Sequence, residues 1–387
     1  LALDGPSGHG ASIRIGGAKR NPKRLDFTVG GAPPPTADGW TSVCEAVESA
    51  PPMSASPPER TTRVAVVIVN YRTAELTLRC IDSLVADRSE NNELHVVVVE
   101  NDSGDAEALR AGIEQRGWGD WVRLIVSGRN GGFAYGNNLG VQSCWDRAER
   151  PDYFWLLNPD CEVRPGATAE LVRFLEQHPR AGIAGSSLEF EDGEPWPIAF
   201  RFPSLWAELE DGLRFGPVSQ LLEDRKMTRA MGDSPEQVDW LPGASMMIRA
   251  EVFESVGFMD EGYFLYYEET DFCLKAARHG WETWYVPSSR VMHICGQSTG
   301  VTVVDARPKR LPAYWFESRR RYFTKNHGPL YALGADLVFM AGRTAAELRR
   351  ALERKPSQDP PKLLSDFATR GTPASFARRV LKKTRSP

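Results

Sequence analysis

A continuous apolar run at Val64–Val69 constrains the fold more than any other stretch of this chain. Six successive apolar residues are typical of a strand buried on both faces, as in a parallel sheet covered by helices. Further β-rich runs are found at residues 94–99, 122–126 and 153–157. Helical patterns are expected between and after them, at residues 76–85, 106–115, 134–147 and 167–177. Strands that alternate with helices predict a mainly parallel, doubly wound α/β sheet.

The rest of the chain has a less regular pattern. Residues 189–238 are rich in proline, tryptophan and charge, and we predict irregular structure there. Regular patterns then return as helices at 250–256, 268–279 and 311–326, and as a strand at 281–286. The expected organisation is a disordered segment at 1–60, an α/β domain at 61–305 and a basic helical C-terminal extension at 306–387.

The N-terminal segment is rich in Gly, Pro, Ser and Ala and lacks periodicity, so it cannot bury enough apolar surface to offset its ordering entropy. Met53 stands shortly before the first strong strand, and we expect native translation to begin there. The six cysteines are widely spread and form no CxxC pair, which favours reduced thiols in a cytosolic protein. Cys295 near His293 suggests a zinc pair, but structural zinc needs four ligands at tighter spacing.

The C-terminal region is strongly basic. From Arg307 onward there are 19 lysines and arginines against 6 acidic residues, although the whole chain carries a net charge of −4. Residues 376–383 alternate apolar groups with cations, and an anionic membrane surface is one expected partner. The alternative is a solvated helix that packs on the protein body. No nucleic-acid recognition motif accompanies the charge, and no apolar run is long enough to cross a membrane. The expected location is the cytoplasm, with peripheral contact to the inner face of the plasma membrane.

Polar clusters follow the first four predicted strands. They are Asn70–Thr73, Glu100–Asp105, Gly128–Asn138 and Asn158–Asp160. One such cluster alone is more often a turn or a helix cap. Because ligands of parallel sheets bind beyond the carboxyl ends of the strands, four clusters together predict a binding site. No GxGxxG or P-loop signature is present, which disfavours a nicotinamide dehydrogenase.

From Val64 to Ser298, these clusters and two later motifs resemble the family 2 glycosyltransferases of the GT-A fold. The chain is most similar to the bacterial rhamnosyltransferase-like branch of that family. The later motifs are Trp240–Ala244 and Tyr266–Leu274, and a histidine, His293, follows them. The resemblance implies a Rossmann-like half that binds a nucleotide sugar and a later half that binds the acceptor. The Trp240–Ala244 loop is expected to shape the pocket beneath the donor sugar.

The resemblance also assigns the donor site. We expect Glu100 to contact the base or ribose, with Asp102 as the alternative for the same contact. The glycines Gly131 and Gly132 permit close approach of the donor to the backbone. Asn138 is expected either to bind the donor or to fix its loop. The full set of expected donor residues is Asn70, Glu100, Asp102, Gly131, Gly132, Asn138 and Asn158.

Asn158–Asp160 occupies the position of the family's Asp-x-Asp motif. Asp160 is the expected direct ligand of Mg²⁺ or Mn²⁺, since hard carboxylate oxygens suit these cations. The resemblance adds His293 as a second ligand. Such a cation neutralises the charge of a departing diphosphate.

Glu269 occupies the position of the family's catalytic base. Inverting transfer needs one carboxylate to take the acceptor proton, and Asp271 is the alternative base or an acceptor-orienting group. If Glu269 opens a helix, the helix dipole favours its ionised form at neutral pH.

The expected reaction is transfer of a sugar from a nucleoside-diphosphate donor to a hydroxyl group, with inversion. The first expected donor is dTDP-rhamnose and the second a UDP-hexose. The expected acceptor is a cell-surface polysaccharide or a polyprenyl-linked glycan precursor. The alternative is a membrane-associated carbohydrate- or nucleotide-binding protein whose active site has lapsed, because glutamate stands at positions 100 and 269 where the family usually has aspartate.

Overall fold

The computed structural model describes residues 61–88, 92–145, 150–294, 308–357 and 359–376 of the 387-residue chain. The predicted disorder of residues 1–60 and the predicted start at Met53 lie outside these residues. The same holds for Cys295 and for the basic segment beyond Phe376. The described residues belong to one compact unit.

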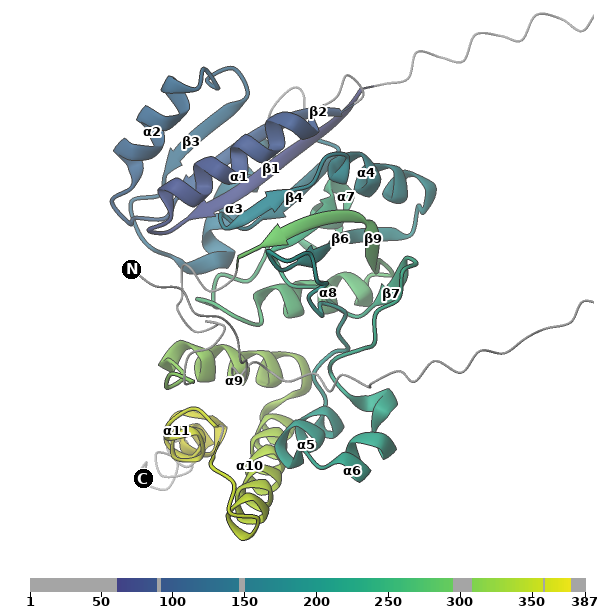
Figure 1. Cartoon of the computed structure of the whole chain (residues 1–387). Coiled ribbons are helices and arrows are strands. Elements are labelled where there is room, and N and C mark those ends of the chain that lie inside the picture. Colours follow the sequence, from purple (N-terminus) through teal and green to yellow (C-terminus); the bar gives the residue numbers. More distant parts are fainter. Residues whose placement is uncertain (1–60, 89–91, 146–149, 295–307, 358, 377–387) are drawn as a thin grey trace, which may run out of the picture. The chain divides into compact units, whose positions relative to one another are not determined.

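The described strands form a single sheet (Figure 1). Its order is β3-β2-β1-β4-β8-β6-β9-β5, and β7 pairs with β9. The strands are β1 (Thr62–Asn70), β2 (Asn92–Glu100), β3 (Val122–Val126), β4 (Tyr153–Leu157), β5 (Cys161–Val163), β6 (Ala181–Glu189), β7 (Glu236–Val238), β8 (Ser245–Arg249) and β9 (Glu282–His293). β1 pairs in parallel with β2 and β4, β2 with β3, and β6 with β9, whereas β8, β5 and β7 run antiparallel to their neighbours. The predicted α/β class with a mostly parallel central sheet is confirmed.

Helices cover both faces of this sheet. They are α1 (Ala74–Asp87), α2 (Ala106–Gln115), α3 (Gly132–Trp145), α4 (Ala167–Gln177), α7 (Ala250–Val256) and α8 (Glu268–Arg278). Val64, Val66 and Ile68 of β1 pack with α1, α2 and α4 in one core. The alternate residues Ala65 and Val67 pack with α3, α7 and α8 in a second core. Every second residue therefore faces a different helix layer, which explains why the run at Val64–Val69 is apolar throughout.

Helices from two separate stretches of the chain, one between β6 and β7 and one after β9, pack together. They are α5 (Leu205–Leu213), α6 (Gly216–Leu221), α9 (Ala313–His327), α10 (Pro329–Leu352) and α11 (Leu363–Arg370), and a short 3₁₀ turn, η1 (Glu223–Arg225), follows α6. α5 lies beside α10 (Figure 1). A Cβ added to Gly212 of α5 would lie 2.8 Å from the carbonyl oxygen of Phe339, and one added to Gly342 would lie 3.0 Å from the nitrogen of Leu213. Glycine thus lets the two helix backbones meet.

A buried ion cluster joins the same helices. The Arg319 guanidinium of α9 lies 2.9 Å from Glu208 Oε2 of α5 and 3.2 Å from Asp336 Oδ1 of α10. All three side chains are buried. Burial raises the pKa of Glu208 to about 7, although the nearby Arg319 opposes that rise. Two acidic groups from different helices therefore hold one buried cation.

The prediction of irregular structure at residues 189–238 is wrong in part, because α5, α6 and β7 lie there. Four strands were also missed. They are β5, β6, β7 and β8. Among the described residues, no helix combines the length and apolarity that a bilayer crossing requires.

Candidate functional site

The carboxyl ends of β1 and β2 lie side by side, as the strand pattern predicts. Asn70 is the register partner of Glu100, and Glu100 is the register partner of Val126 at the end of β3. Asn70 and Glu100 are both buried. The polar clusters that follow the parallel strands therefore share one edge of the sheet.

The Asn70 side chain binds neighbouring loops. Its amide nitrogen donates to Asp105 Oδ2 at 2.9 Å, and its oxygen accepts from the hydroxyls of Thr73 and Thr77 at 3.1 and 2.9 Å. These contacts engage both polar atoms of the amide. Asn70 thus holds together the loops that surround the expected donor site.

Glu100 uses one carboxylate oxygen in a similar way. Its Oε1 accepts from the backbone nitrogen of Ser103 at 2.5 Å and from the Ser103 hydroxyl at 2.6 Å. Asp102, between them, is exposed and has a φ of 59°. The Glu100 carboxylate thus stabilises the tight turn after β2, and its hydrogen bonds in the described structure fall on Oε1.

The glycine pair at the start of α3 meets the segment that precedes α8. Gly132 has a φ of 84°, and a Cβ there would lie 1.9 Å from the carbonyl oxygen of Phe264. The Phe133 nitrogen donates to that same oxygen at 3.0 Å. At Gly131 a Cβ would lie 2.3 Å from the ring of Tyr135. Close packing within the protein therefore requires both glycines, whatever ligand approaches them.

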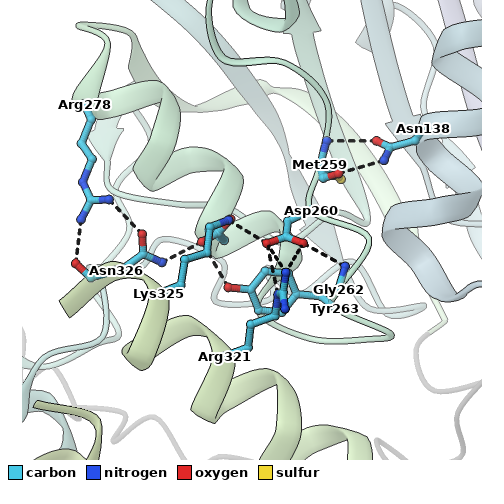
Figure 2. A network of polar contacts seen from close by, with 10 residues as sticks. Asn138, Met259, Asp260, Gly262, Tyr263, Arg278, Arg321, Lys325 and Asn326 are labelled. Carbon is cyan, nitrogen blue, oxygen red and sulfur yellow. Dashed lines mark hydrogen bonds and ion pairs between the residues drawn. The ribbon is translucent and has the colours of Figure 1, made fainter. Parts of the chain in front are cut away.

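Asn138 ties α3 to the turn before α8 (Figure 2). Its Nδ2 donates to the Met259 carbonyl at 2.9 Å and to Glu261 Oε1 at 3.0 Å, and its Oδ1 accepts from the Met259 nitrogen at 3.0 Å. These bonds use both polar atoms of the amide. Of the two expected roles for Asn138, the contacts support loop fixation.

Asp160 and His293 meet because β5 pairs with β9. Cys161 is the register partner of His293, so Asp160 comes just before the paired residue. Asp160 Oδ1 lies 3.2 Å from His293 Nε2, and both side chains are buried. The Trp196 ring, at a centroid distance of 5.2 Å, covers the imidazole. Two groups that lie 133 residues apart in sequence thus form one compact pair.

The atoms around His293 suit a divalent cation. Asn158 Nδ2 lies 3.3 Å from the same Nε2 that Asp160 approaches, and one ring nitrogen cannot accept from the amide and donate to the carboxylate at once. A cation between the carboxylate and the imidazole lone pair would replace the contact between these two groups, and the Asn158 amide would then no longer donate to Nε2. The Cys161 thiol lies within 4.8 Å of both ligand atoms, but it also donates to the Ala244 carbonyl at 3.4 Å. The carboxylate oxygen suits Mn²⁺ or Mg²⁺, and a carboxylate together with an imidazole also occurs in zinc sites.

α8 begins at Glu268, so Glu269 lies in its first turn. The two residues that precede α8, Tyr266 and Tyr267, have φ values of 70° and 69°, a conformation that costs free energy in non-glycine residues. Oε2 of Glu268 and Oε2 of Glu269 are buried, and neither accepts a hydrogen bond in the described structure. The carboxyl groups of these two neighbouring residues are therefore held out of water without full hydrogen bonding.

Burial dominates the electrostatics of this pair. It raises the pKa of Glu269 to about 7, and burial together with the neighbouring Glu269 raises the pKa of Glu268 well above its usual range. We expected the helix dipole to keep Glu269 ionised, but desolvation acts in the opposite direction and is larger. Glu269 is thus poised to exchange a proton near neutral pH.

Asp271 lies in a different environment, among polar contacts of Tyr263, Lys325 and Asn326, which Figure 2 labels. Its Oδ1 accepts from the Tyr263 hydroxyl at 3.1 Å and from Asn326 Nδ2 at 2.7 Å, and its Oδ2 lies 2.6 Å from Lys325 Nζ. Lys325 also contacts Asp260 at 2.8 Å. These contacts link α8 to α9 and engage both carboxylate oxygens of Asp271. They support a positioning role for Asp271 and leave Glu269 as the better candidate base.

The Trp240–Ala244 loop connects the parts of the site. The Ala244 carbonyl accepts from the Asn158 nitrogen at 2.9 Å and from Cys161. A Cβ at Gly243 would lie 2.6 Å from the Phe133 ring. At its other end, the Leu241 backbone approaches the Cys273 thiol, one helical turn after Glu269. One loop thus contacts the Asp160 turn, the start of α3 and the helix of the candidate base.

Two side chains beside the candidate metal pair were not expected as part of the site. Trp196 lies in the stretch for which we predicted irregular structure, and no pattern there indicated a contact with His293. Cys161 follows Asp160 directly, so its position next to the expected ligand was the available signal.

Comparison with known proteins found a matching family model, relatives in sequence and neighbours in structure. A model of the glycosyltransferase-like family 2 matches residues 61–324. An N-acetylglucosaminyl-diphospho-decaprenol L-rhamnosyltransferase of Mycobacterium tuberculosis is 29% identical over 231 residues, which cover 57% of this chain and 73% of the relative. A dTDP-rhamnosyl transferase, RfbF, of Shigella flexneri is 25% identical over 284 residues, covering 71% and 85%. The crystal structure of GalNAc-T7 with UDP, GalNAc and Mn²⁺ aligns with a TM-score of 0.49 and 17% identity over 80% of this chain and 58% of that one.

Proposed function

Since this chain belongs to the glycosyltransferase-like family 2, we propose that it is an inverting transferase that moves a sugar from a nucleoside diphosphate to a hydroxyl group. The observation that carries the proposal is the buried contact between Asp160 and His293 at 3.2 Å. It lies at the end of β4, where a sheet of this topology binds ligands. The Trp240–Ala244 loop contacts the Asp160 turn and approaches Cys273 of α8, the helix that carries Glu269, which supports a single active site.

In the proposed reaction Glu269 is the general base. Its carboxylate takes the proton of the acceptor hydroxyl while the acceptor oxygen bonds to the anomeric carbon. The bond between that carbon and the diphosphate oxygen breaks, and the nucleoside diphosphate leaves. No covalent enzyme intermediate forms, so one carboxylate is sufficient.

Asp160 and His293 would hold Mg²⁺ or Mn²⁺ through a carboxylate oxygen and an imidazole nitrogen. When bound, the cation would neutralise the negative charge that develops on the departing diphosphate. The Asn158 side chain borders the proposed cation position, because its Nδ2 lies 3.3 Å from the same His293 Nε2. Burial of both ligands keeps competing water away from the site.

We propose dTDP-rhamnose as the first donor and a UDP-hexose as the second, because two relatives are named rhamnosyl transferases. The proposed acceptor is a glycan precursor linked to a polyprenyl diphosphate, or a growing surface polysaccharide. Such an acceptor is held at a membrane, and the basic C-terminal segment at 376–383 suits an anionic surface of that kind.

A panel of sugar nucleotides tests this function directly. We expect nucleoside diphosphate release with one donor in the presence of Mn²⁺ or Mg²⁺, and loss of at least about a hundredfold in rate with excess EDTA. Readdition of the metal should restore the rate. Nucleotide binding without release for every donor and metal would instead support a binding protein with a lapsed active site.

The dependence of kcat/KM on pH should report the ionisation of Glu269. A general base works only when it is deprotonated, and burial raises the pKa of Glu269 to about 7. We therefore expect kcat/KM to rise about tenfold for each pH unit below that value and to level off above it. Donor affinity measured at the same pH values separates this effect from binding. A flat profile between about pH 5.5 and 8.5 would exclude Glu269 as the titrating base.

A further inference from the structure

The outer face of α10 carries no charge. Within Pro329–Leu352, all of which the structure describes, the exposed residues are Pro329, Leu330, Leu337, Ala341, Thr344, Ala345, Leu348, Ala351 and Leu352. The four leucines among them are 73, 51, 63 and 87% exposed in chain order. Scattered single leucines are normal on a protein surface, but four on one helix form a patch.

These leucines share one side of the helix. Leu330, Leu337 and Leu348 are spaced by seven and eleven residues, close to two and three turns, and Leu352 follows one turn later. We call Leu330, Leu337, Leu348 and Leu352 the leucine face. It extends along nearly the whole of α10.

Two of the five charged residues of α10 are buried, and the other three, Glu347, Arg349 and Arg350, are half-buried beside its exposed side. An ordinary surface helix faces the core with its apolar residues and the solvent with its charges. In α10, Asp336 and Arg343 are buried. Asp336 pairs with Arg319, and Arg343 donates to the Asp211 carbonyl at 2.9 Å. The neighbouring α9 shows the usual pattern, because its exposed residues include Glu317, Arg321 and Lys325. The outer side of α10 therefore suits an apolar environment.

The size of the leucine face argues for lipid over protein as its partner. A helix of 24 residues is about 36 Å long and about 10 Å wide, so the face covers about 360 Å². A stable protein interface buries about 800 Å² on each partner. The chain's own residues 377–387 would span only about 16 Å as a helix, less than half of the face. A lipid surface, in contrast, accepts the apolar side of one helix.

Cations gather at the end of the same helix. Arg349 and Arg350 lie in its last turn, and the exposed Arg354 and Lys355 follow. Glu347 pairs with Arg350 and Glu353 with Lys355, so these four cations and two carboxylates leave a net charge of +2. The Arg349 guanidinium lies 5.0 Å from the ring centre of Phe215, which is itself 42% exposed next to α5. Positive charge beside exposed apolar groups complements anionic lipid headgroups.

We propose that the leucine face of α10 is a membrane-contact surface, which lies in the boundary between headgroups and acyl chains of an anionic bilayer. The helix lies in the plane of the bilayer, with its buried side still packed on α5 and α9. This contact is independent of the basic segment at 376–383 and of the transfer reaction. It gives the protein a defined orientation on the lipid surface.

Co-sedimentation of the full chain with vesicles of equal parts phosphatidylcholine and phosphatidylglycerol tests the proposal. The variant Leu337→Gln/Leu348→Gln/Leu352→Gln should lower the partition coefficient by at least about 30-fold, because three leucine side chains that would enter the lipid are lost. The matched control is Val85→Gln/Val126→Gln. These valines are 44 and 50% exposed on other elements, and their replacement should leave partitioning unchanged.

Thermal melting establishes that both variants fold, which the exposure of the replaced residues leads us to expect. Equal vesicle binding by the leucine variant and the wild type would overturn the proposal, as would a wild-type chain that does not sediment with vesicles. Sedimentation velocity without lipid tests the rival partner. If the wild type dimerises and the leucine variant does not, a second copy covers the face and the proposal is wrong. None of these measurements depends on sugar transfer, so they stand apart from the proposed function.

Discussion

Replacement of Asp160 by alanine is expected to lower the turnover number by about a thousandfold or more. The carboxylate lies 3.2 Å from His293 Nε2, and its loss removes the anionic half of the candidate metal pair. The remaining imidazole binds a divalent cation weakly, so the departing diphosphate loses most of its charge neutralisation. Steady-state release of nucleoside diphosphate measures the effect, and titration with Mn²⁺ should show much weaker binding.

Glu162→Ala is the matched control for that experiment. Glu162 lies two residues from Asp160 in β5, but it pairs with Arg79 on the protein surface. Its removal deletes a nearby carboxylate without changing the Asp160–His293 contact, so turnover should stay within about threefold, because an exposed ion pair contributes little to stability. Wild-type turnover and metal dependence in Asp160→Ala would reject Asp160 as a ligand.

Replacement of Glu269 by glutamine should lower kcat by about 10²- to 10⁴-fold, the usual contribution of a general base. Glutamine has nearly the same volume and removes only the ability to take a proton. Affinities for the donor and for Mn²⁺ should therefore remain close to those of the wild type. The rise of kcat/KM with pH should also disappear, because the titrating group is gone.

Asp271→Asn separates the role of Asp271 from that of Glu269, another acidic residue of α8. Asp271 accepts from Tyr263 and Asn326 and pairs with Lys325, so its neutralisation weakens the link between α8 and α9. We expect the melting temperature to fall by a few degrees, with a smaller loss of kcat than in Glu269→Gln. A large loss of kcat in Asp271→Asn together with an active Glu269→Gln would reverse the assignment of the base.

The first half of the sheet was predictable because its strands have strong local patterns. β1 and β4 are buried on both sides, and their apolar runs are uninterrupted. β6 was missed because it consists largely of small residues. A Cβ at Gly182 would lie 2.7 Å from Val252, and one at Gly185 would lie 2.7 Å from Leu241. The crowded environment that requires glycine there comes from distant segments and leaves no periodic signal.

The candidate site was predictable in its residues and much less in their roles. The family resemblance indicated Asp160 and His293, but their contact depends on the antiparallel pairing of β5 with β9. Asn138 and Asp271 were expected near the substrates. Their hydrogen-bond partners, Met259 and Lys325, lie 121 and 54 residues away in the chain, and only the folded structure brings them together.

The ion cluster around Arg319 bears on how such proteins can be recombined. Glu208 belongs to the segment between β6 and β7, whereas Arg319 and Asp336 belong to the C-terminal helices. A chimera that exchanges the C-terminal helices alone would leave Glu208 facing a foreign surface and would separate Gly212 from Gly342. A buried charge without its counter-ion costs free energy, so a chimera that folds must carry both segments from the same parent. The two segments thus form one structural unit although they are separated in the chain.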